Sequence, residues 1–153
     1  MRGSRRPEME DAVNEIRTAL AWIEELPYGS KVLHLIEGTE GTRSQPGWVG
    51  IREIINRIIG DIIERTGWSG GVIEGIEIPE VIDQHEALRM LEEGTQKLAQ
   101  LAYDTGAAET RKRRIEATGS PRFHPHSTEG EINFMKNRVK EIRDGLGAAG
   151  FRV

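Results

Sequence analysis

The chain contains no cysteine, few aromatic residues and no long hydrophobic run. Without cysteine it can form neither a disulfide, nor a thiolate zinc site, nor a cysteine nucleophile, which fits a reducing compartment. No apolar stretch approaches the roughly 18–20 residues of a membrane-spanning helix, and no secretory hydrophobic segment follows the N-terminus. We therefore expect an intracellular, cytoplasmic protein without a membrane partner.

Proline and glycine are sparse inside the amphipathic stretches and concentrated between them. All six prolines fall outside the strongest helical patterns, and most of the 18 glycines cluster at 38–50, 67–75 and 145–150. Because proline breaks a helix interior and glycine weakens it, this punctuation separates helical segments. The pattern predicts helices over about 8–26, 30–37, 48–66, 80–117 and 128–146, the fourth continuing through Gly106 or bending there.

These segments define an all-α protein, a compact bundle of four to five helices with glycine-rich loops that we expect to be oligomeric. We interpret residues 1–7 as a disordered or tag-like N-terminus, 8–118 as the helical core domain and 119–127 as a linker. Residues 128–153 then form a C-terminal helix that packs on the core or on a neighbouring subunit. Residues 72–78 can form a short extended segment, but a lone strand has no obvious partner.

The first and last long segments each carry an apolar stripe at helical spacing. The fourth has a similar stripe, with His85 and Thr95 on the same face. Thr128 and Glu131 have the spacing of a capping box at the start of the last helix. The stripe residues are Met9, Val13, Ile16, Leu20 and Ile23; Val81, Leu88, Leu91, Leu98 and Ala102; and Ile132, Met135, Val139, Ile142 and Leu146.

The strongest pattern is a run of isoleucines in the third segment. At 100° per residue they cover an arc of roughly 180°, which is too wide for a single neighbouring helix. Two interpretations remain open, a helix inside the core and a helix shared between the core and a homo-oligomer interface. Arg57, Asp61 and Glu64 lie on the opposite arc, where we expect them to be solvated. The isoleucines are Ile51, Ile54, Ile55, Ile58, Ile59, Ile62 and Ile63.

A basic cluster follows the fourth segment. The net charge of −4 argues against nonspecific coating of nucleic acid but allows one local basic site. The cluster can bind phosphates of RNA or DNA, act as a nuclear-import signal, or pair with an acidic face such as 74–93. Its candidate residues are Arg111, Lys112, Arg113, Arg114 and Arg122.

The loop at 38–50 has no apolar side chain before Trp48 except Pro46. It precedes a helix but lacks the Gly-Lys-Ser/Thr ending of a P-loop, which disfavours nucleotide binding. Exposed tryptophan and arginine are common at protein interfaces. We therefore expect a mobile loop that binds a partner through Arg43 and Trp48.

Metal sites have weaker support. His124 and His126 flank a proline without a fixed third ligand, so we expect no metal and no cofactor. We expect His85 to be buried with one hydrogen bond, and His34 has no partner that the sequence identifies. Helical carboxylate pairs can hold Mg²⁺, as in all-α nucleotide pyrophosphatases. The candidate pairs are Asp61 with Glu64 and Glu80 with Asp83.

These features favour a small, non-enzymatic helical interaction or regulatory protein that self-associates through the isoleucine helix and binds a protein partner. Its composition is compatible with a viral or phage accessory protein. The first alternative is an oligomeric RNA- or DNA-binding protein that uses residues 111–126, in the nucleus if the basic cluster acts as an import signal. The second is a Mg²⁺-dependent pyrophosphatase-like enzyme.

Overall fold

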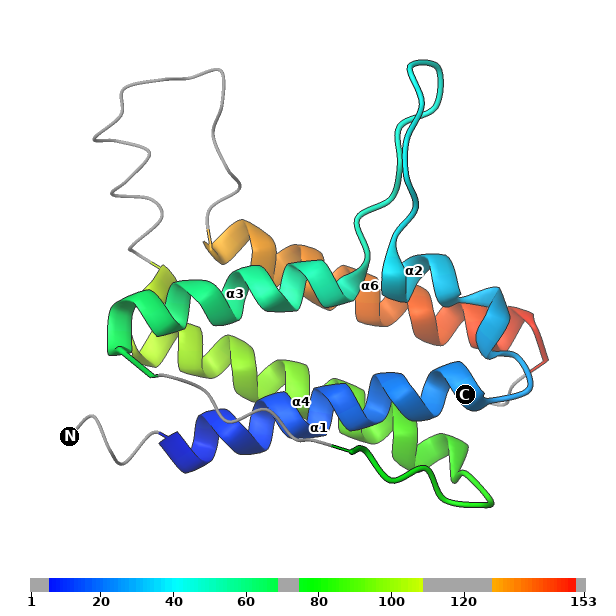
Figure 1. The fold of residues 1–153 in the computed structure, drawn as a ribbon, viewed down its shortest axis with the longest axis horizontal. Helices are drawn as coiled ribbons and strands as arrows, with labels where there is room; N and C mark the ends of the chain where they lie inside the picture. The colour runs from blue at the N-terminus through cyan, green and yellow to red at the C-terminus, as the bar shows by residue number, and fades with distance from the viewer. Residues whose placement is uncertain (1–5, 69–74, 109–127, 151–153) are drawn as a thin grey trace.

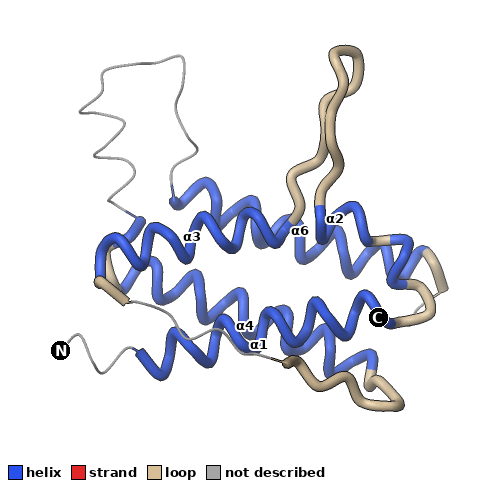
Figure 2. Tube along the Cα trace, viewed as in Figure 1, coloured by secondary structure: helices blue, strands red, loops and turns tan. Residues whose placement is uncertain are grey.

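The protein is an antiparallel helical bundle, seen in a computed structural model that describes residues 6–68, 75–108 and 128–150 (Figures 1 and 2). The described residues contain helices and loops but no strand, so the all-α prediction is confirmed. None of the described helices is both long and apolar enough to cross a membrane. The elements are α1 (Arg6–Glu25), the 3₁₀ turn η2 (Gly29–Lys31), α2 (Leu33–Glu37), α3 (Ile51–Thr66), α4 (Gln84–Asp104) and α6 (Thr128–Ala148).

The four long helices form two layers. Helix α1 packs along α4 in one layer, and α3 packs along α6 in the other, with the short α2 beside α3 and α6 (Figure 1). Contacts of α4 with α3 and α6 join the layers. The predicted apolar stripes of α1 and α6 are buried throughout, as expected when each helix turns one face to a common core.

The isoleucine face of α3 is covered by the chain itself. Six of the seven isoleucines are buried, and Ile63, at the end of the run, is 37% exposed. Helix α3 contacts α2, α4 and α6, so three elements supply the neighbours that its wide arc requires. Self-association through this face would require the bundle to open. The homo-oligomer stays a prediction of the sequence.

The polar side of α3 is less solvated than expected. Asp61 is buried, and the Thr128 hydroxyl lies 2.6 Å from its Oδ2 and 3.2 Å from the carbonyl oxygen of Ala107. The prediction that Asp61 is solvated is therefore wrong. The reason is that α6 covers the flank of α3 beyond the isoleucines, where a buried carboxylate is tolerated because a donor reaches it.

Glu131 is also buried, and its side chain reaches across to α3. Its Oε1 accepts a hydrogen bond of 3.1 Å from Arg57, which also pairs with Glu53 at 3.0 Å. Burial alone would lower the pKa of Arg57, but the hydrogen bond from Arg57 to Glu131 raises it on balance. The α3–α6 interface is thus partly polar, a property that apolar spacing does not reveal.

Helix α4 begins later than predicted. Asp83 is its N-cap, because the Asp83 carboxylate accepts a hydrogen bond of 3.1 Å from the Glu86 amide. Val81 is therefore outside the helix and 84% exposed, and His85 in the first turn is exposed as well, so neither lies on the buried stripe. At the other end the helix stops at Asp104, and Gly106, with φ of +78°, makes the bend that the sequence left open.

We expect Thr128→Val to lower the free energy of unfolding by about 1–3 kcal/mol, because the buried Asp61 carboxylate loses a donor. Urea denaturation followed by circular dichroism measures the change. Thr105→Val is the matched control, since the hydroxyl of Thr105, the C-cap of α4, donates locally to the Leu101 carbonyl at 2.6 Å. In an Asp61→Asn background the Thr128→Val cost should change, and strict additivity would contradict the contact.

Candidate functional site

Residues 38–50, which we call the finger, project from the bundle between α2 and α3 (Figures 1 and 2). Its two arms are joined near the bundle, where the Thr39 amide donates to the Trp48 carbonyl at 2.8 Å and the Trp48 amide donates to the Thr39 hydroxyl at 2.9 Å. At the tip the Thr42 amide donates to the Gln45 carbonyl at 2.7 Å. The segment predicted as a mobile loop therefore consists of two arms joined by hydrogen bonds.

Glycine allows the arms to approach this closely. A Cβ atom on Gly47 would lie 2.1 Å from the Thr39 carbonyl oxygen, and one on Gly41 would lie 2.5 Å from the Gly47 nitrogen. Side chains at these positions would force the arms apart. The glycine content of this segment therefore supports a particular backbone arrangement and is more than a sign of flexibility.

Three charged residues, which we call the root triad, hold the base of the finger. Arg52, near the start of α3, pairs with Glu24 at the end of α1 and with Glu37 at the end of α2, each at 2.6 Å. Burial raises the pKa of Glu24, the neighbouring Glu37 carboxyl raises it further, and Arg52 opposes both. Because Glu37 directly precedes the finger and Arg52 follows it closely, the triad ties both arms to α1.

An exposed aromatic cluster lies where the finger meets α6. The buried Arg138 guanidinium lies 4.8 Å from the centre of the Trp48 ring and 4.7 Å from that of Phe134, and it pairs with Glu141. Trp48 is 49% exposed and Phe134 38% exposed. The centres of the His34 and Trp48 rings lie 6.0 Å apart, and the two rings are arranged edge to face. We call Trp48, Phe134 and Arg138 the aromatic root.

The structure separates the two predicted contact residues of this segment. Arg43 is exposed at the tip, whereas Trp48 packs at the base. Sequence reasoning missed Phe134 and Arg138, because α6 is remote from the finger along the chain. The available signal was an aromatic residue outside the apolar stripe of α6, where a purely solvated face would carry a polar one.

The other sequence candidates do not form a site in the described structure. Arg111, Lys112, Arg113, Arg114 and Arg122, with His124 and His126, lie outside the described residues, so phosphate binding there stays a prediction. One carboxylate of each pair proposed for Mg²⁺ has another role, since Asp61 faces Thr128 and Asp83 caps α4. Within the described ranges, no group of three or more histidine, aspartate or glutamate side chains is placed to hold a metal ion.

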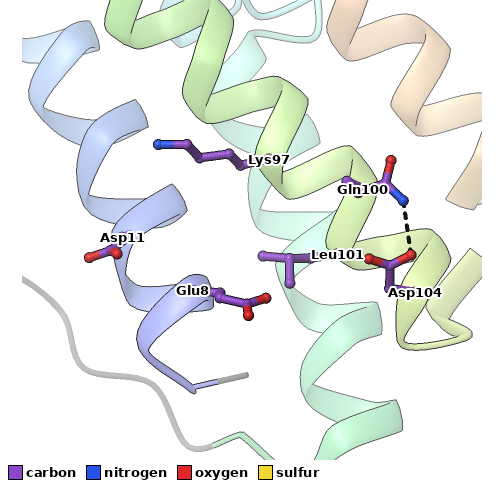
Figure 3. A pocket seen from close by; sticks show the side chains of 6 residues that line it. All are labelled: Glu8, Asp11, Lys97, Gln100, Leu101 and Asp104. Atoms are coloured by element: carbon purple, nitrogen blue, oxygen red, sulfur yellow. Dashed lines mark hydrogen bonds between the residues drawn. The ribbon is translucent and has the colours of Figure 1, made fainter. Parts of the chain in front are cut away.

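A groove of about 290 Å³ lies between the start of α1 and the end of α4 (Figure 3). Three of its polar side chains already have partners, since Gln100 donates to Asp104 at 2.9 Å and the Lys97 amine pairs with Glu15 at 2.6 Å. We assign no ligand to it. The lining residues are Glu8, Asp11, Lys97, Gln100, Leu101 and Asp104.

Comparison of the chain with known protein families, with curated proteins and with solved structures finds no match. The class of protein therefore follows from the fold alone, an all-α bundle that carries a projecting finger. Any functional conclusion depends on the chemistry of the finger and its base.

Proposed function

We propose that this protein is a non-enzymatic interaction module that binds a protein partner with the finger and the aromatic root. The observation that carries the proposal is the shape of the finger. Residues 39–48 are all exposed and add nothing to the core, yet backbone hydrogen bonds join the two arms and glycine allows them to lie close together. A projection kept in shape outside the core is suited to contact another molecule.

The composition of this surface supports a protein partner. Tryptophan and arginine are enriched among the residues that dominate binding energy at protein interfaces. Trp48 and Phe134 expose apolar rings while Arg138 holds them in place, so little side-chain entropy is lost on binding. The exposed Arg43 extends the same surface to the tip.

Site-specific photocrosslinking in cells of the source organism tests the proposal. A benzophenone amino acid is placed at Arg43, at Phe134 or at Tyr103 in separate variants. Tyr103 is the matched control, because it is an aromatic residue on a long helix and is 44% exposed, but it lies in the other layer, on α4. We expect an adduct of the same mass at Arg43 and Phe134 and none at Tyr103, and Trp48→Ala should weaken it.

An adduct of twice the chain mass would identify the partner as a second copy, and any other mass would identify a different protein. Adducts at Arg43 and Phe134 that are no stronger than those at Tyr103 would refute the proposal. Circular dichroism of each variant checks that the bundle remains folded.

A further inference from the structure

We propose that Thr39 and Thr42 are the positioning residues of the finger, and that their hydroxyl groups set the register between its two arms. The inference rests on the proposed function, because it concerns how the partner-binding surface is held. Thr39 and Thr42 lie on the first arm, and the residues they contact, Gln45 and Trp48, lie on the second. The register decides which side chains reach the tip and which stay at the base.

Each threonine makes the same two contacts with the opposite arm. The Thr39 amide donates to the Trp48 carbonyl at 2.8 Å, and the Thr39 hydroxyl accepts from the Trp48 amide at 2.9 Å. At the tip, the Thr42 amide donates to the Gln45 carbonyl at 2.7 Å, and the Thr42 hydroxyl accepts from the Gln45 amide at 3.1 Å. In a β-hairpin, a backbone carbonyl takes the place of each hydroxyl. Both pairs belong to one antiparallel register, because three residues forward on the first arm correspond to three residues back on the second.

Arms of this composition specify their register only weakly by themselves. Residues 39–48 are all exposed and are polar or glycine apart from Pro46 and Trp48, so no buried apolar face distinguishes one register from another. Gly41 and Gly47 lie between the two pairs and let the arms come close together. The two hydroxyls therefore supply the selectivity that a buried face supplies in other hairpins.

The two pairs position opposite ends of the proposed surface. Thr39 holds both backbone groups of Trp48, whose ring lies against the Arg138 guanidinium. A slip of one residue would turn the Trp48 side chain to the other side of its arm, away from Arg138. Thr42 closes the turn that contains Arg43. The first pair thus serves the aromatic root and the second serves the tip.

Hydrogen exchange of the full chain without a partner, followed by nuclear magnetic resonance, tests the inference. Valine has nearly the shape of threonine and a similar preference for extended backbone, but its side chain accepts no hydrogen bond. We expect Thr39→Val to speed exchange of the Trp48 amide about 2–10-fold, and Thr42→Val to do the same at Gln45, through loss of one hydrogen bond each. Thr39→Val should also shift the Trp48 indole resonances, because the ring is released from Arg138, whereas Thr42→Val should leave them unchanged.

The conservative variants Thr39→Ser and Thr42→Ser should keep the exchange rates of the unaltered protein, because serine retains the hydroxyl. Thr66→Val is the matched control. The Thr66 hydroxyl accepts from the Trp68 amide at 3.2 Å, so this variant removes the same kind of contact outside the finger and should leave the finger amides unchanged.

Two outcomes overturn the inference. One is exchange at Trp48 and Gln45 that is no faster in the valine variants than in the unaltered protein. The other is exchange in the serine variants that is as fast as in the valine variants. Because these measurements need no partner, a failed crosslink at Arg43 and Phe134 would refute the proposed function and leave the exchange result standing.

Discussion

Ile58→Ala is expected to lower the free energy of unfolding by about 2–5 kcal/mol, through lost apolar burial and the cavity left behind. Ile58 is fully buried in the middle of α3, and α3 packs against α2, α4 and α6. Close packing on all of these sides limits how far the core can collapse into the vacated space. Urea denaturation followed by circular dichroism, at two protein concentrations, measures the loss.

Ile63→Ala is the matched control, because it makes the same chemical change on the same helix at a position that is 37% exposed. It should cost less than about 1 kcal/mol. The pair also tests how the isoleucine face is used. If that face contributed mainly to an interface between subunits, the Ile58→Ala midpoint would depend on protein concentration. Equal losses in the two variants would contradict the core assignment.

Gly94→Ala is expected to destabilise the protein by about 1–3 kcal/mol, because it overpacks the contact between α1 and α4. A Cβ atom on Gly94 would lie 2.8 Å from Ile16 Cγ1 and 3.2 Å from the Ile16 backbone nitrogen. Helix propensity alone would instead stabilise this variant by roughly 1 kcal/mol. The two physical effects therefore predict opposite signs, and the clash should dominate.

Gly60→Ala separates the two effects. Gly60 also lies inside a long helix, but it is exposed, and a Cβ atom there would meet no atom within 4 Å. This variant should be stabilised by about 0.5–1 kcal/mol, the gain in helix propensity alone. Thermal denaturation of both variants measures whether the melting temperature falls, as expected for Gly94→Ala, or rises, as expected for Gly60→Ala. Stabilisation by Gly94→Ala would mean that the two helices do not approach as closely as described.

Much of the fold was predictable because it depends on local properties of the chain. Apolar spacing in α1, α3 and α6 determines which side chains share a helix face, and those faces are buried as expected, apart from Ile63. Proline and glycine marked the connections. The start of α4 was predicted too early, at Pro79–Glu80, because proline is common in the first turn of a helix. The helix in fact begins after Asp83, whose side chain caps it, and a single aspartate is a weaker sequence signal than a proline.

The candidate site was predictable only in part. Composition singled out the finger and the residues Arg43 and Trp48, since a polar, glycine-rich segment with one tryptophan stands out between helices. The aromatic root was not predictable, because Arg138 of α6 meets Trp48 of the finger, which is far away along the chain. The root triad also joins residues from three separate elements, so no local spacing indicates it.

The sequence by itself determined an all-α bundle, the apolar face of each long helix and the position of the projecting segment. These properties follow from residue periodicity and from the backbone preferences of proline and glycine. Only the tertiary structure decided that Asp61 and Glu131 are buried, that hydrogen bonds join the two arms of the finger and that Arg52 pairs with Glu37 at its base. The physical reason is that helical spacing specifies which residues of one helix lie together, whereas burial and pairing depend on which other helix covers them.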